Sequence, residues 1–260
     1  MDSEIIKAII LGLTQGFTEF LPISSTAHLI LIPWIFGWSG EVNTMSFDIA
    51  LHAGTLLALF ACFYKEWIDI LIKKHNMLIF LIIATIPGAV IGALLDHFVE
   101  RTLRSPLIIS ASLIVIGIFM YISEKRYKTS RSFDEISLLD AVIIGISQAV
   151  AIIPGVSRSG ITLSTGLMRG INRGDSARFS FLLSTPIVAG AVVIHGYSII
   201  KGHSDIDLRL FTSGVIASFI SGIFAIKFLL QYFKKHSMMV FVYYRIILAV
   251  AIVAGLWVKG

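Results

Sequence analysis

The stretch of sequence that decides the fold spans residues 5–36, which read IIKAIILGLTQGFTEFLPISSTAHLILIPWIF. It is apolar over most of its length, but Pro22-Ile23-Ser24-Ser25 interrupts it near the middle. Proline lacks the backbone donor that a helix needs and disfavours helix at the residue before it. The stretch therefore predicts two short helices with a break between them. In a membrane, such a break must face protein or a water-filled cavity, because unpaired backbone is not tolerated against lipid.

A second stretch, residues 138–168, has the same character and reads LLDAVIIGISQAVAIIPGVSRSGITLSTGLM. Its break is the segment from Pro154 to Gly160. Residues 8–15 align with residues 141–148, and Pro22 and Pro154 are separated by nearly the same offset. Similarity that keeps its register in this way indicates an internal duplication, with halves of about residues 1–125 and 138–260.

The composition points to lipid as the solvent. Of the 260 residues, 56% are hydrophobic and only 14% are charged, and the mean hydropathy is +0.88. Soluble globular domains are about 45–50% apolar and about 25% charged. A water-soluble fold, a disordered chain and a collagen-like chain are therefore excluded. Because Cys62 is the sole cysteine, an intrachain disulfide is excluded too.

The remaining apolar stretches predict the membrane spans. A helical span needs about 20 apolar residues. Each half would hold one broken, re-entrant hairpin followed by three spans, and because three is odd, the second half must enter the membrane from the opposite side. The sequence thus predicts an all-α polytopic membrane protein with an inverted-topology repeat, in which residues 1–260 form a single integral membrane domain. Six stretches outside the two breaks approach the length of a span: 47–64, 77–95, 106–123, 179–200, 210–230 and 239–258.

The charge distribution predicts the orientation. The chain carries a formal charge of +5 and has a pI near 9.4, but its lysines and arginines form no stripe, so we expect no nucleic-acid partner. We read the basic excess as a topology signal instead, because positive residues are enriched in cytoplasmic loops. If the first break opens to the outside, the inner segments carry twice as many lysines and arginines as the outer ones. Those inner segments are 65–76, 124–140, 169–178 and 231–238.

Around the first break, several polar residues stand in an apolar run. Gln15 and Glu19 are four residues apart and share one helix face. An ionised carboxylate at membrane depth is costly and tends to be functional, although an amphipathic packing face is the alternative. If a helix restarts at Ser25, this serine caps it and His28 lies one turn further on the same side. Capping alone is the alternative for the hydroxyl groups.

The second break has the composition of a phosphate site. Glycines let backbone amides turn toward an anion, a helix N-terminus presents free donors, and a guanidinium meets two phosphate oxygens together. Gly155, Ser157, Arg158, Ser159 and Gly160 supply these features, although the glycines also suit close helix packing. An arginine between membrane helices needs an anionic partner.

An inverted repeat brings two such breaks together near the membrane midplane. A hydroxyl, a histidine, a carboxylate and an arginine would then meet, which is a set that suits phosphoryl transfer. Asp48, His52, His195 and Arg245 are weaker candidates at membrane depth. For His52, a packing role and a place facing the site both stay open.

Three motifs carry a family resemblance. The undecaprenyl-diphosphate phosphatases of the bacitracin-resistance type share a Glu/Gln-x-x-x-Glu motif, a Pro-x-Ser-Ser-Thr-x-His motif and a Pro-Gly-x-Ser-Arg-Ser-Gly motif. This sequence resembles them at residues 15–19, 22–28 and 154–160, in the same order. The resemblance implies a bacterial inner-membrane enzyme that hydrolyses undecaprenyl (C55 isoprenoid) diphosphate to the monophosphate and inorganic phosphate. This hydrolysis recycles the lipid carrier for peptidoglycan synthesis and thereby serves cell shape and bacitracin resistance.

The resemblance also implies roles for individual residues. Ser25 would be the nucleophile, and His28, Glu19 and Arg158 would complete the catalytic set. A divalent cation, Mg²⁺ or Ca²⁺, would support activity, with Glu19 and Gln15 as the candidate ligands. The family has Glu or Gln at the position of Gln15, and the neutral amide adds no charge for a cation there. The phosphate would be bound by residues of both breaks: Gln15, Ser24, Thr26, Gly155, Ser157, Ser159 and Gly160.

Two questions stay open at the level of sequence. His28 or Glu19 could activate water directly, with Ser25 only binding phosphate. The rival function is transport of an anion or of the lipid itself, because secondary transporters use inverted repeats with broken helices at the midplane. An enzyme that also moves the carrier across the bilayer is a further alternative. The preferred prenyl length and the formation of a homodimer are undetermined.

Overall fold

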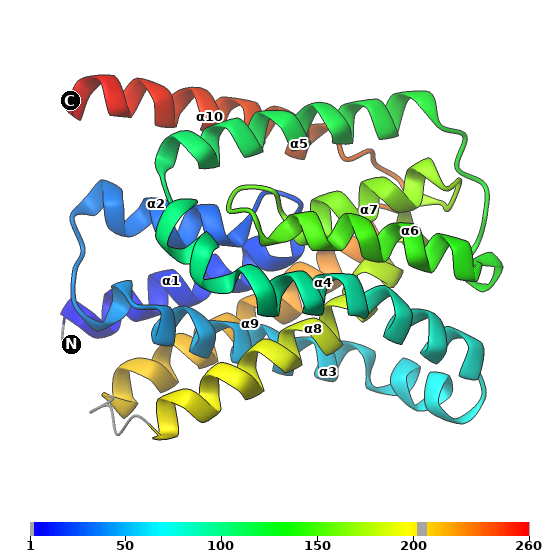
Figure 1. Cartoon of the computed structure of the whole chain (residues 1–260), viewed down its shortest axis with the longest axis horizontal. Helices are drawn as coiled ribbons and strands as arrows, with labels where there is room; N and C mark the ends of the chain where they lie inside the picture. Colours follow the sequence, from blue (N-terminus) through cyan, green and yellow to red (C-terminus); the bar gives the residue numbers. More distant parts are fainter. Residues whose placement is uncertain (1–2, 202–206, 260) are drawn as a thin grey trace.

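The computed structural model of the chain describes residues 3–201 and 207–259, and this part of the chain is helical (Figure 1). In the described residues, the only β-type pairing is an isolated bridge between Arg131 and Ile171. The α-helices are, in chain order, α1 Ser3–Phe20, α2 Ser25–Phe36, α3 Met45–Ile72, α4 His75–Thr102, α5 Pro106–Arg126, α6 Leu138–Ala149, α7 Arg158–Met168, α8 Arg173–Lys201, α9 Leu208–Tyr232 and α10 Met239–Lys259.

The six predicted spans are confirmed as long apolar helices. Within the described ranges, α3, α4, α5, α8, α9 and α10 are each long and apolar enough to cross a membrane. Several run past the predicted bounds; α3, for example, continues to Ile72 instead of ending at residue 64. Pro87 and Pro186 lie inside α4 and α8 without ending either helix. Both predicted breaks are present, because α1 ends before α2 begins and α6 ends before α7 begins.

The two breaks share an unusual backbone conformation. Ser24 has φ +76° and Ser157 has φ +71°, and among the described residues these are the non-glycine positions with positive φ. Each caps the helix that follows it: Ser24 Oγ accepts from the Ala27 amide, and Ser157 Oγ accepts from the Gly160 amide. Strained backbone of this kind persists only where the surroundings enforce it. The two breaks thus have matching geometry, while the inverted sense of the repeat stays a prediction.

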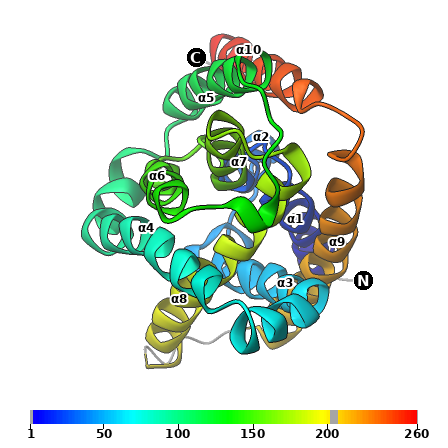
Figure 2. The same ribbon diagram turned by 90° about the vertical axis from the view of Figure 1, so that its right-hand side faces the viewer.

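Long helices surround the short ones. Viewed along the bundle, α2 and α7 lie in the centre, with α5 and α10 on one side and α3, α4 and α9 around the rest (Figure 2). Small residues allow the closest approach, as at Gly12 in α1, where an added Cβ would lie 2.4 Å from the backbone oxygen of Gly214 in α9. The packing of the outer helices therefore holds both breaks inside the protein, where irregular backbone is tolerated.

Candidate active site

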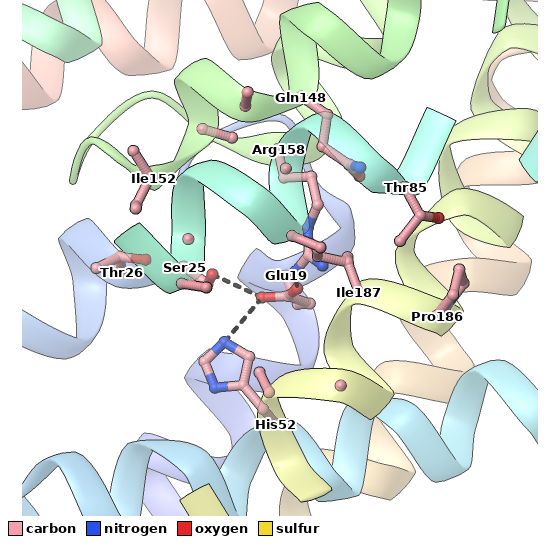
Figure 3. A pocket seen from close by; sticks show the side chains of 18 of the residues that line it. Glu19, Ser25, Thr26, His52, Thr85, Gln148, Ile152, Arg158, Pro186 and Ile187 are labelled. Carbon is pink, nitrogen blue, oxygen red and sulfur yellow. Dashed lines mark hydrogen bonds and ion pairs between the residues drawn. The ribbon is translucent and has the colours of Figure 1, made fainter. Parts of the chain in front are cut away.

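The two breaks meet at one cavity of about 760 Å³. Glu19, in the last turn of α1, and Ser25, the first residue of α2, line it from the first break. Arg158, the first residue of α7, lines it from the second, and His52 reaches it from α3 (Figure 3). Residues that are more than one hundred positions apart in sequence thus surround one space, as the sequence predicts for Glu19, Ser25 and Arg158.

Glu19 is at the centre of the polar contacts. Its side chain is only 3% exposed. Its Oε1 forms an ion pair with Arg158, and its Oε2 accepts hydrogen bonds from Ser25 Oγ at 2.7 Å and from Gln15 Nε2 at 3.0 Å. His52 Nε2 lies 3.6 Å from the same Oε2. A buried carboxylate is tolerated only when it is paired and hydrogen-bonded, and these contacts meet that condition.

Ser25 is placed as a nucleophile would be. Its hydroxyl points at a carboxylate that can take its proton, at 2.7 Å, and its side chain faces the cavity (Figure 3). A nucleophile within hydrogen-bond reach of a base, with the base held by further groups, is the arrangement that activates a hydroxyl. The guanidinium of Arg158 pairs with the other oxygen of Glu19 and is the kind of cation that binds a phosphoryl group.

His28 lies elsewhere. Its Nδ1 is 2.7 Å from the backbone oxygen of Ser24, and its Nε2 is 2.7 Å from the hydroxyl of Tyr244 in α10. The ring also stacks on that of Tyr244. His28 is not among the residues that line the cavity, so the structure does not bring it together with Glu19 and Arg158. Its catalytic role stays a prediction.

The sequence predicts His28 as the histidine beside Glu19, but in the structure His52 lies at that position. Its Nδ1 is 2.7 Å from the backbone oxygen of Asp48, and its Nε2 faces Glu19. His52 therefore lies between Glu19 and the backbone of its own helix at Asp48. The sequence signal for His52 is its position at membrane depth, which favours a packing role over a place facing the site.

The predicted phosphate-binding residues divide into two groups. Ser24, Thr26 and Ser157 line the cavity together with Arg158. Gln15 and three residues of the second break are not among its lining residues: Gly155, Ser159 and Gly160.

The second group holds the breaks in place. Ser159 Oγ donates to the backbone oxygen of Leu21 at 3.2 Å and so joins the second break to the first. Gly155 has φ +93°, and an added Cβ would lie 2.7 Å from the backbone oxygen of Ile109. Only glycine combines this conformation with so close an approach. Their phosphate-binding roles stay predictions.

Arg245 ties the two breaks together from α10. It is fully buried, and among the described residues it forms no ion pair. Its guanidinium donates to the backbone oxygens of Pro22 at 3.2 Å, Gly155 at 2.7 Å and Val156 at 3.1 Å, and to that of Leu113 in α5 at 3.2 Å. Carbonyl dipoles of both breaks therefore stabilise this cation, and the cation in turn fixes the path of both breaks.

The donor set fits a cation that binds together with a phosphorylated substrate. In the described part of the chain, no three His, Cys, Asp or Glu side chains gather as a metal cluster. One carboxylate, Glu19, lines the cavity together with Gln148, whose buried Oε1 lacks a hydrogen-bond partner. Gln15 Oε1 is also buried without a partner. Mg²⁺ is commonly held by one or two carboxylates plus substrate phosphates, and amide oxygens suit hard cations.

Comparison with known proteins places the chain in a family. The family model described as "Bacitracin resistance protein BacA" matches residues 8–251. The chain is 54% identical over 250 residues to a protein of Thermodesulfovibrio yellowstonii named undecaprenyl-diphosphatase, with 96% of each chain covered. A protein of the same name from Pelotomaculum thermopropionicum is 44% identical over 257 residues, with 96% of each chain covered. Another, from Moorella thermoacetica, is 44% identical over 264 residues, which cover 98% of this chain and 99% of the relative. The chain belongs to the bacitracin resistance protein BacA family.

Proposed function

We propose that this multi-pass membrane protein hydrolyses undecaprenyl diphosphate to undecaprenyl monophosphate and inorganic phosphate, and so returns the lipid carrier to cell-wall synthesis. The observation that carries the proposal is the contact of Ser25 and Arg158 with one buried carboxylate, Glu19, at the meeting point of the two breaks. The names of its relatives, which match over almost the full chain, support the same substrate.

The geometry supports a mechanism in which Glu19 accepts the proton of Ser25. Arg158 binds the terminal phosphate, whose negative charge competes with Glu19 for the guanidinium. Ser25 Oγ attacks the terminal phosphorus as its proton passes to Glu19. The bond from that phosphorus to the bridging oxygen breaks, and the prenyl monophosphate leaves. Water then hydrolyses the phosphoserine. In the alternative, Glu19 activates a water for direct attack and Ser25 donates a hydrogen bond to the phosphate.

A divalent cation is part of the proposal. Glu19 would hold it together with the diphosphate, and the unpartnered Oε1 of Gln148 is a further oxygen at the cavity; Gln15, the second candidate ligand from the sequence, does not line the cavity. When bound, Mg²⁺ or Ca²⁺ would neutralise charge on the phosphate oxygens. Arg158 and the hydroxyl groups of the breaks orient the phosphate in either case.

The position of the cavity in the bundle supports a location for the site. Met45, at the start of α3, and His195, near the end of α8, also line the cavity. Both lie toward the ends that the charge distribution assigns to the outside. We therefore place the enzyme in the bacterial inner membrane with its site open to the periplasmic face, while homodimer formation stays a prediction.

The experiment that tests this function is phosphate release from C55 diphosphate by the purified protein in detergent, with and without a chelator. Wild type should release phosphate, and Arg158→Ala should lose that activity. Arg209→Ala, which removes an exposed arginine at the start of α9, should behave as wild type. A folded wild-type protein that releases no phosphate would overturn the proposal and favour the transporter alternative, which vesicle assays would then test.

A further inference from the structure

The cavity does not end at the catalytic groups but continues between α4 and α8. On α4 its lining residues recur at intervals of three and four, so they form one face of the helix, and a facing set on α8 has the same spacing. Six of these eleven lining residues are glycine or alanine, four of them on α4 and two on α8. The α4 residues are Thr85, Gly88, Ala89, Gly92 and Ala93, and the α8 residues are Pro186, Ile187, Gly190, Ala191, Ile194 and His195.

Two of these glycines are not explained by helix packing. At Gly12 and Gly145, which serve close helix contacts, an added Cβ would lie within 2.4 to 2.6 Å of backbone atoms. At Gly92 and Gly190 an added Cβ would meet nothing within 4 Å. The two helices contact each other at Gly88, where an added Cβ would lie 3.6 Å from Ile187, but at Gly92 and Gly190 they leave a groove open.

The groove opens sideways toward the hydrocarbon of the membrane. Next to its lining residues, α4 exposes Ile86 and Val90 and α8 exposes Val193, and the lining residue Ile194 is exposed as well. Large apolar side chains that are exposed on a membrane helix face lipid. A chain that lies in the groove can therefore leave the protein directly into the bilayer.

A polar group marks the inner end of the groove. Gln148 lines the same cavity on the α6 side, close to Arg158 in Figure 3. It is 3% exposed, and its Nε2 donates to the backbone oxygen of Ala84 at 3.3 Å, but its Oε1 has no hydrogen-bond partner in the described structure. A buried acceptor without a partner is costly, and a water, a protonated phosphate oxygen or a hard cation that accompanies a diphosphate would satisfy it.

We propose that the groove between α4 and α8 binds the first isoprene units of the substrate, and that Gly92 and Gly190 provide the width that a branched, unsaturated chain requires. This inference rests on the proposed function. The groove is continuous with the site at Ser25 and Arg158, is apolar along its length, opens to lipid and has a polar group at its inner end. A diphosphate at Arg158 would direct its prenyl chain past Gln148 into this groove, with the remaining units in the bilayer.

Substitutions that narrow the groove test this inference. Gly92→Leu and Gly190→Leu put a side chain into open space, so they should leave the fold intact. Gly196→Leu is the matched control: it lies on the same helix as Gly190 and has equally open surroundings, but it does not line the cavity. We would measure kcat and KM in detergent for C55 and C15 prenyl diphosphates and for methyl diphosphate, which has no isoprene unit, and compare thermal unfolding of all variants.

We expect KM for the C55 and C15 substrates to rise at least about tenfold in Gly92→Leu and Gly190→Leu, with kcat nearly unchanged. The rise should be smaller for methyl diphosphate, and Gly196→Leu should match wild type. An equal effect on all three substrates, or no effect at either glycine, would overturn the inference.

A second measurement separates this inference from the proposed function, because it needs no turnover. A prenyl diphosphate analogue with a photoreactive group on its second isoprene unit is irradiated with the wild-type protein. Peptide mapping should find the label on residues 85–93 of α4 or 186–194 of α8. Label on other helices would overturn the groove assignment even if phosphate is released, and label in the groove without phosphate release would overturn only the proposed function.

Discussion

At the scale of single residues, the hydroxyl of Ser25 is the group on which the covalent mechanism depends. Its contact with Glu19 gives the hydroxyl proton an acceptor at 2.7 Å. Ser25→Ala should lower kcat by at least about 100-fold, because the attacking atom is removed. The measurement is phosphate release combined with a search for phosphoserine in acid-quenched wild type. Ser39→Ala, in an exposed loop, is the control, and near-normal turnover by Ser25→Ala would eliminate the covalent route.

His28 allows a sharper test at the same scale. In the structure its Nδ1 lies against the Ser24 oxygen, in the strained turn that presents Ser25. An asparagine side chain can reproduce that hydrogen bond but cannot carry a proton as imidazole does. If His28 supports the turn, His28→Asn should retain several times the kcat of His28→Ala. Equal loss in the two variants would instead support the proton-transfer role that the family resemblance implies.

The sequence identified most of the residues at the site but not their orientations. Glu19, Ser25 and Arg158 were predictable because charge and hydroxyl groups at a break in a membrane helix have few structural uses. The orientation of the His28 side chain was not predictable, because the ring contacts Tyr244 of α10, which is more than two hundred positions away in the sequence. The place of His52 was not predictable either, because the rotation of α3 about its axis is set by packing against other helices.

At the scale of elements, both breaks depend on one cation from α10. Arg245→Met should leave the buried oxygens of Pro22, Gly155 and Val156 without their donor. Each orphaned acceptor costs about 1–3 kcal/mol, so the free energy of unfolding should fall by at least about 2 kcal/mol.

The measurement for this prediction is thermal unfolding in detergent together with phosphate release. Activity should fall more than the fraction of folded protein, because the breaks lose their common anchor. Arg209→Met serves as the control for removal of an arginine. Unchanged stability and activity in Arg245→Met would show that the breaks hold their geometry without this anchor.

The breaks themselves were the most predictable elements. Proline and serine at positions 22–25, and glycine, serine and arginine at 154–160, predicted interruptions that the structure confirms. By contrast, Pro87 and Pro186 lie within continuous helices. Proline is tolerated in membrane helices when neighbouring groups compensate for the lost hydrogen bond, and sequence alone does not reveal those neighbours.

At the scale of the whole molecule, the end assigned to the cytoplasm is held by a buried acid. Asp140, at the start of α6, accepts hydrogen bonds from Arg131 at 2.6 Å and Arg169 at 2.7 Å, and from the amide and hydroxyl of Ser137. Burial alone would raise the pKa of this carboxyl, but the hydrogen bonds from Arg131, Ser137 and Arg169 outweigh it and hold the pKa well below its usual range.

The pH dependence of stability follows from the direction of this shift. The pKa of an aspartate in the unfolded chain is about 4. Above this pH, a carboxyl whose pKa is lowered by folding makes its whole contribution to stability, and as the pH falls below this value the contribution is lost. Asp140→Asn should therefore lower the free energy of unfolding by about 3 kcal/mol at pH 7. The difference from wild type should narrow only below about pH 4. Asp69→Asn, which removes an acid from an exposed ion pair on α3, should change little. A difference that is absent at pH 7, or that does not narrow in acid, would contradict this assignment.

For the whole molecule, the number of spans and the placement of polar residues could be predicted, because a membrane restricts which sequence patterns can cross it. The lateral groove could not be predicted. Its glycines and alanines have the spacing of ordinary helix-packing residues, and only the open space around Gly92 and Gly190 distinguishes a groove from a close contact. The central claim remains that two breaks, far apart in sequence, form one catalytic unit.

The measurement that tests this claim most directly is a double-mutant cycle across the breaks, with Glu19→Gln in the first and Arg158→Gln in the second. Each variant alone should lower kcat/KM for C55 diphosphate by at least about 100-fold. Because the two side chains contact each other and act as one unit, the double variant should be little worse than either single variant. Losses that multiply in the double variant would contradict the claim that Glu19 and Arg158 serve the same site.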